Sequence, residues 1–108
     1  MTREEVLDCF KVVIDMHPDI VLKGKTMPYT SANGHMFSSL NKAGELGLRL
    51  DKEDREQFLV DHQTELFVTY NTVMKEYVHV PESLLQQPKK FLTYLEKSYQ
   101  YILSLKPK

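Results

Sequence analysis

The stretch that decides the fold covers residues 27–50 and reads MPYTSANGHMFSSLNKAGELGLRL. Two turn signals divide it: the pair Asn33-Gly34, and the segment KAGE at residues 42–45. Asn-Gly is the preferred pair for a two-residue hairpin turn, because both of its positions need a positive φ. The stretch therefore predicts a meander of three short antiparallel strands. These strands cover residues 27–31, 35–41 and 46–50.

One helix is predicted before this meander and two after it. Thr2 and Glu5 match a capping box at the start of the first helix, which His17-Pro18 ends. Asp51 caps the second helix, which fades near residue 62. Pro88 suits the first position of the last helix, where its missing amide costs nothing.

Two further strands are predicted between the second helix and the last one. Residues 66–69 and 74–80 have strand composition, and a break at residues 70–72 separates them. The chain is long enough for one domain, over residues 1–108. This order of elements predicts an α+β fold, an antiparallel sheet of about five strands with helices packed on one face.

The composition excludes several classes of protein. A net charge of −1 gives no global attraction to nucleic acid or to an anionic membrane. One cysteine, Cys9, cannot form an intramolecular disulfide. The start is acidic where a signal peptide would be basic, and no apolar run approaches the ~18 residues of a membrane span. We therefore expect a cytoplasmic protein with no membrane contact and no cofactor.

Four short motifs, taken in order, resemble one family. They are NGHMF at 33–37, LGLRL at 46–50, VMKEYVHVP at 73–81 and SLKPK at 104–108. Their order and spacing are similar to the TfoX N-terminal domain family, named for a regulator of natural competence in bacteria. The resemblance implies an α+β fold of the secretion-chaperone-like group. Residues 25–29 replace the family's Phe-Gly-Gly segment, and we expect no counterpart of the regulator's second domain in this chain. The resemblance therefore implies the fold rather than the regulatory role.

Strand alternation sorts the sheet residues into two faces. The face expected against the helices holds Met36, Ser38, Leu40, Leu46, Leu48, Leu50, Val78 and Val80. The open face is expected to hold His35, Phe37, Arg49, Tyr77 and His79, with Tyr29 as a candidate sixth member. Aromatic and arginine side chains commonly anchor partners at protein surfaces. We therefore expect this face to bind a second copy, another protein or a small ligand; a solvated face, or one covered by residues 18–25, is the alternative.

Metal binding and catalysis receive little support from the sequence. The four histidines show no HxH or HExxH spacing, which predicts no metal site. Ser38-Ser39 lacks the strand-turn-helix context of a nucleophilic serine. The alternative function is a small-ligand-binding protein or an enzyme that uses the face of His35, Arg49 and Tyr77.

The lysines of the last helix and its tail are the only candidate basic patch. They are Lys89, Lys90, Lys97, Lys106 and Lys108. Weak nucleic-acid binding through them is a further alternative, although lysines also occur near helix C-termini for electrostatic reasons. The sequence as a whole favours a non-enzymatic interaction or regulatory module, with a homodimer through the open sheet face as its candidate assembly.

Overall fold

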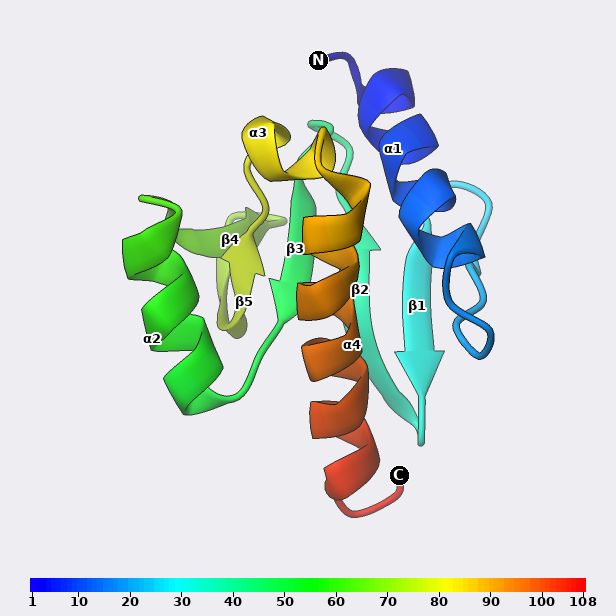
Figure 1. Ribbon diagram of the computed structural model, residues 1–108, viewed down its shortest axis with the longest axis vertical. Helices are drawn as coiled ribbons and strands as arrows, with labels where there is room; N and C mark the ends of the chain where they lie inside the picture. Colours follow the sequence, from blue (N-terminus) through cyan, green and yellow to red (C-terminus); the bar gives the residue numbers. More distant parts are fainter.

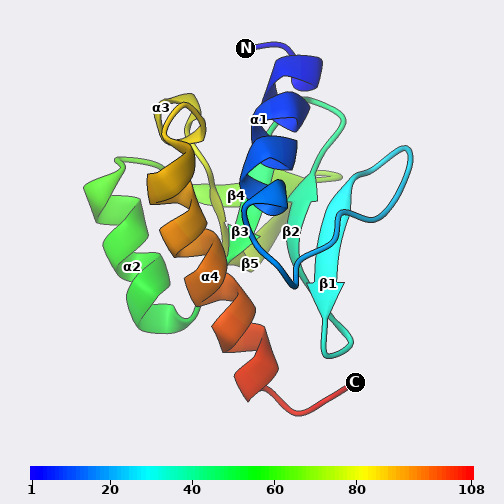
Figure 2. The same cartoon turned by 45° about the vertical axis from the view of Figure 1, so that its right-hand side comes forward.

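The computed structural model describes residues 1–108 as a five-stranded antiparallel sheet with helices α1 to α4 in front of it (Figure 1). The strands are β1 (Tyr29–Ala32), β2 (His35–Leu40), β3 (Leu46–Arg49), β4 (Leu66–Thr69) and β5 (Thr72–His79). The helices are α1 (Arg3–Asp15), α2 (Lys52–Asp61), α3 (Glu82–Leu85) and α4 (Pro88–Ser104). The strand order is β1-β2-β3-β5-β4, and Figure 2 shows α2, α4 and α1 side by side in front of the strands. The predicted α+β fold is confirmed.

Two local features differ from the prediction. The single-turn helix α3, which was not predicted, packs against α1 and α4 and buries Leu84 and Leu85. β5 begins at Thr72 rather than at residue 74, because Tyr70 and Asn71 form a tight two-residue turn. β4 and β5 are therefore one hairpin instead of two strands separated by a longer break.

The predicted helix caps are made. The amide of Glu5 donates to the Thr2 hydroxyl, and the amide of Thr2 donates to the Glu5 carboxylate at 2.8 Å. The amide of Asp54 donates to the Asp51 carboxylate at 2.9 Å. Each cap satisfies amides that the first helical turn leaves without a partner, so these helix starts are determined locally.

The main core lies between the sheet and the helices. Its sheet side includes Leu46, Leu48, Leu50, Val78 and Val80. Phe10 of α1 and Phe91 of α4 cover these residues, with their ring centres 6.3 Å apart. Burial of each such side chain stabilises the fold by about 1.5–3 kcal/mol. This packing fixes α1 and α4 to the front of the sheet.

A β-bulge in β2 reverses the expected direction of Phe37. The register between β1 and β2 runs from Thr30↔Ser38 to Ser31↔Met36, which leaves Phe37 as an extra residue in β2. The Phe37 side chain is 1% exposed and lies in the main core, against the Tyr99 ring of α4. Met36 is half-buried and is not part of that core. The expectation that Phe37 lies on the open face is therefore wrong, because strict alternation fails at a bulge.

The β4–β5 hairpin covers part of the back of the sheet, and β4 lies at a steep angle to β3 (Figure 1). A side-chain carbon at Gly47 of β3 would come within 2.3 Å of the Phe67 ring of β4. The two strands can approach this closely only because Gly47 has no side chain. Phe67 is itself buried, and its ring centre lies 6.4 Å from that of Tyr77. The predicted open face is thus partly closed by the chain itself.

Candidate functional site

Tyr77 is a buried part of the back of the sheet. Its side chain is 7% exposed, and its hydroxyl donates to the carbonyl of Met36 at 2.8 Å. Burial raises the pKa of Tyr77 to about 12. The hydroxyl therefore joins β5 to β2 across β3 and stays protonated at neutral pH.

Arg49 pairs in register with Tyr77, but its guanidinium turns toward α4. Its Nε donates to Glu76 at 2.8 Å, and its guanidinium carbon lies 5.6 Å from the centre of the Tyr101 ring. The Tyr101 hydroxyl donates to the other Glu76 oxygen at 2.8 Å. Burial alone would raise the pKa of Glu76, but the hydrogen bonds from Tyr101 and Arg49 and the charges of Arg49 and Arg55 outweigh it and lower that pKa. The network joins β3, β5, α2 and α4.

The two histidines predicted for the site lie apart from each other. The Nε2 of His35 donates to the carbonyl of Lys106 at 2.8 Å, so His35 holds the tail that follows α4. His79 pairs in register with Gly47 and has its Nε2 3.9 Å from Glu45. The five predicted residues therefore do not form one site, and a binding role for His35, Arg49 and His79 stays a prediction.

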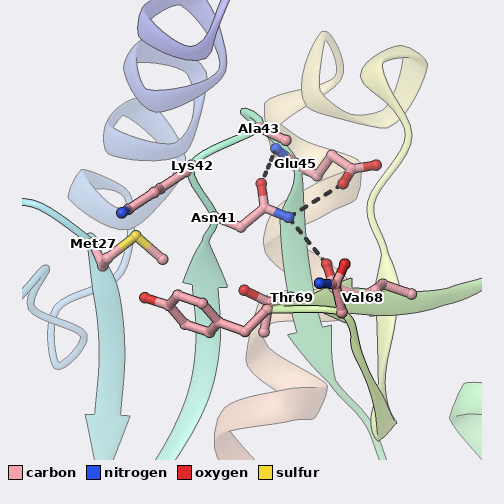
Figure 3. Close-up of a pocket in the computed structure, with 9 residues that line it drawn as sticks. Met27, Asn41, Lys42, Ala43, Glu45, Val68 and Thr69 are labelled. Carbon is pink, nitrogen blue, oxygen red and sulfur yellow. Dashed lines mark hydrogen bonds between the residues drawn. The ribbon is translucent and has the colours of Figure 1, made fainter.

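Another surface, at the tip of the β4–β5 hairpin, remains accessible. Tyr70 is 72% exposed, and Val68 beside it is also exposed. Both line a hollow of about 310 Å³, together with residues 41–43 and Glu45 of the β2–β3 turn and with Met27 (Figure 3). We call Val68, Tyr70 and this hollow the hairpin face.

Tyr70 is held in a backbone conformation that its residue type disfavours. The turn has φ of 52° at Tyr70 and 59° at Asn71, and Thr69 pairs with Thr72 on either side of it. This is the geometry for which Asn-Gly is preferred. A left-handed conformation costs an ordinary residue about 1–2 kcal/mol. The sequence analysis did not predict this hairpin turn, because Asn-Gly was the only pair interpreted as a two-residue turn. The pair Tyr70-Asn71 between two strand-like segments is the signal that could have indicated it.

Asn41 makes the hollow rigid (Figure 3). Its side-chain oxygen accepts from the amide of Glu45 at 2.8 Å, and its side-chain nitrogen donates to the Glu45 carboxylate at 3.2 Å and to the carbonyl of Val68 at 3.1 Å. These bonds connect the β2–β3 turn to the β4–β5 hairpin. Because Asn41 is buried and fully bonded, it positions the walls of the hollow.

The family model of the TfoX N-terminal domain matches residues 30–102, from β1 to α4. The chain belongs to the TfoX N-terminal domain family. Neither the curated proteins nor the solved structures gave a match. In this TfoX N-terminal domain, the matched range includes β2 to β5, all of β1 except Tyr29, and both turns that form the hairpin face.

A larger hollow of about 640 Å³ lies between the end of α1 and the outer side of α4 in this TfoX N-terminal domain. His17 on its wall bonds through Nε2 to Glu96 and accepts the amide of Asp19 at Nδ1, at 3.1 Å. Hydrogen bonds from Gln100 and then from His17 lower the pKa of Glu96. Both ring nitrogens are therefore occupied, and the pair fastens α1 to α4 rather than supplying a free base.

The lysines predicted to form a basic patch are dispersed along α4 and its tail in this TfoX N-terminal domain. Lys89 and Lys90 lie at the start of α4, whereas Lys106 and Lys108 follow its end, and 17 residues of helix span about 25 Å. Lys97 between them lies 3.9 Å from Asp54. Nucleic-acid binding through the lysines stays a prediction.

No three His, Cys, Asp or Glu side chains come together as a metal site would require. No helix has the length and apolarity to cross a membrane.

Proposed function

We propose that this TfoX N-terminal domain is a small non-enzymatic interaction module with a regulatory role, which binds a protein surface through the hairpin face. The observation that carries the proposal is Tyr70, an aromatic side chain 72% exposed at a position with φ of 52°. Asparagine or glycine there would give a more stable turn. Strained, exposed residues of this kind occur mainly where function requires them.

The chemistry of the hairpin face suits protein recognition. Tyrosine is enriched among residues that dominate binding energy, because it adds a large contact area and loses little conformational entropy. Val68 adds apolar area next to it, and Val73, the register partner of Val68, is exposed as well. The adjoining hollow is already formed, since Asn41 holds its walls. A partner therefore meets an anchor side chain and a recess on one rigid surface.

A cytoplasmic location is part of the same proposal. Cys9 is a free thiol, which accords with a reducing compartment such as the cytoplasm. The partner is either a second copy of the chain or another protein, and both would use the same surface.

Site-specific photo-crosslinking tests the proposal. A photoreactive phenylalanine analogue replaces Tyr70, and in a matched control it replaces Val60 of α2, which is also 72% exposed. We expect cells that make the protein to yield a crosslinked protein adduct from position 70 and none from position 60. If position 70 gives no adduct, or both positions give the same ones, the hairpin face is not a specific binding surface.

A further inference from the structure

We propose that the occupant of the hairpin face is a second copy of this chain, in a two-fold contact in which Tyr70 of each copy enters the hollow of the other. This inference rests on the proposed function and names its partner. In a two-fold contact the same surface of both copies meets, so that surface must complement itself in shape and in charge.

The shape allows a reciprocal contact. Tyr70 is 72% exposed and also lines the hollow. A two-fold axis placed beside Tyr70 would set each tyrosine over the second copy's hollow, whose volume of about 310 Å³ can accept a side chain. Met27, Ala43 and Val68 supply an apolar lining for the ring. A projection and a recess side by side on one face are what a reciprocal contact needs.

The charge is self-complementary as well. The lining of the hollow carries one cation, Lys42, and one anion, Glu45. Lys42 is exposed and makes no ion pair or side-chain hydrogen bond within the chain. A two-fold axis that passes between these residues sets each Lys42 against the second copy's Glu45. The rim then has no net charge, so two copies approach without repulsion and gain two opposite-charge contacts.

Strand pairing is a less suitable mode of association for this surface. β4 is an edge strand, but Asn41 already occupies the carbonyl of Val68. The register of β4 with β5 is also irregular between Leu66 and Val68. Both features hinder the addition of another strand. Insertion of a side chain therefore accounts for the hairpin face better than extension of the sheet does.

Charge exchange tests for a second copy directly. We compare wild type, Lys42→Glu, Glu45→Lys and an equimolar mixture of the two variants by sedimentation velocity over a range of concentrations. Each variant alone sets like charges together and should weaken self-association about tenfold or more, because like-charge contacts cost several kcal/mol. The mixture restores both opposite-charge contacts and should recover association. A wild type that stays monomeric, or a mixture no stronger than either variant, overturns the proposal.

A second variant tests the contact without removing the hydrogen bond that the Glu45 carboxylate accepts from Asn41. Tyr70→Asn removes the inserted ring and leaves the contacts of Asn41 with Glu45 intact. It should weaken self-association about tenfold or more, whereas Val60→Gln on α2 should leave association unchanged. Circular dichroism of each variant checks that it is folded. Equal self-association of Tyr70→Asn and wild type contradicts the reciprocal contact even if Glu45→Lys does not fold.

The two proposals fail in different ways. The mass of one chain is 12.7 kDa. A position-70 adduct with twice this mass agrees with a second copy as the partner. An adduct of another mass, from a protein that is monomeric by sedimentation, overturns the second copy but supports the interaction module. A monomer without any position-70 adduct overturns both.

Discussion

The side-chain nitrogen of Asn33 donates to the carbonyl oxygen of Ile102 at a distance of 2.9 Å. The same nitrogen donates to the carbonyl of Leu105, also at 2.9 Å. The turn of the first hairpin thus caps the C-terminal end of α4, where the Ile102 carbonyl otherwise accepts only from the Leu105 amide at 3.3 Å. Asn33 therefore has two roles, because its φ of 56° also forms the turn that the sequence predicted.

Asn33→Gly should separate these two roles. Glycine keeps the turn, because it adopts a positive φ readily, but it removes both hydrogen bonds to α4. We expect the free energy of unfolding in urea to fall by about 1–2 kcal/mol. The free energy of unfolding of Asn33→Asp should be lower still, because a carboxylate cannot donate a hydrogen bond and would face the negative end of the helix. A glycine variant as stable as wild type would show that the cap contributes nothing.

Tyr70→Asn should make the folded chain more stable. Asparagine tolerates the left-handed region better than tyrosine, and the tyrosine ring buries little surface in the monomer. We expect the free energy of unfolding to rise by about 1 kcal/mol, measured at a concentration where wild type is monomeric. The same variant should lose self-association, so stability and binding change in opposite directions. A loss of stability on this substitution would mean that Tyr70 is held by contacts within the chain.

Gly47→Ala should destabilise the protein through a clash rather than through backbone strain. The added carbon would lie 2.3–2.7 Å from three atoms of the Phe67 ring. Overpacking of this kind costs about 1–3 kcal/mol. In a double-mutant cycle, Phe67→Leu should reduce the cost of Gly47→Ala, because the smaller side chain can move away. Additive effects of the two substitutions would argue against the close approach of β4 to β3.

Stability should fall steeply in alkali because of Tyr77. Its pKa rises from 10.0 to about 12 on folding, so above pH 10 the unfolded chain loses this proton before the folded chain does. The folded state then binds more protons, and the free energy of unfolding decreases between pH 10 and about 12, by up to about 3 kcal/mol. Tyr77→Phe, which cannot ionise, should show a smaller decrease over this range in urea titrations. Parallel curves for the two proteins would contradict the burial of the hydroxyl.

The sequence predicted the local parts of this fold well. The Asn33-Gly34 turn and the caps at Thr2 and Asp51 are all present. Each depends on residues within a few positions along the chain, so the identity of those residues is sufficient. The motifs that resemble the family belong to the same scaffold, which explains why the resemblance pointed to the fold and not to a site.

The candidate site depended instead on contacts between distant segments. A bulge moved Phe37 to the front of the sheet, Glu76 and Tyr101 drew Arg49 toward α4, and β4 covered Gly47. These outcomes are set by which segments meet in three dimensions, and alternation along a strand carries no information about them. By itself, the sequence determined the approximate positions of the strands, the Asn33-Gly34 turn and the starts of α1, α2 and α4, because these are local. Only the tertiary structure decided which face is open, since it brings Asn41 to Val68 and leaves Tyr70 exposed beside a hollow.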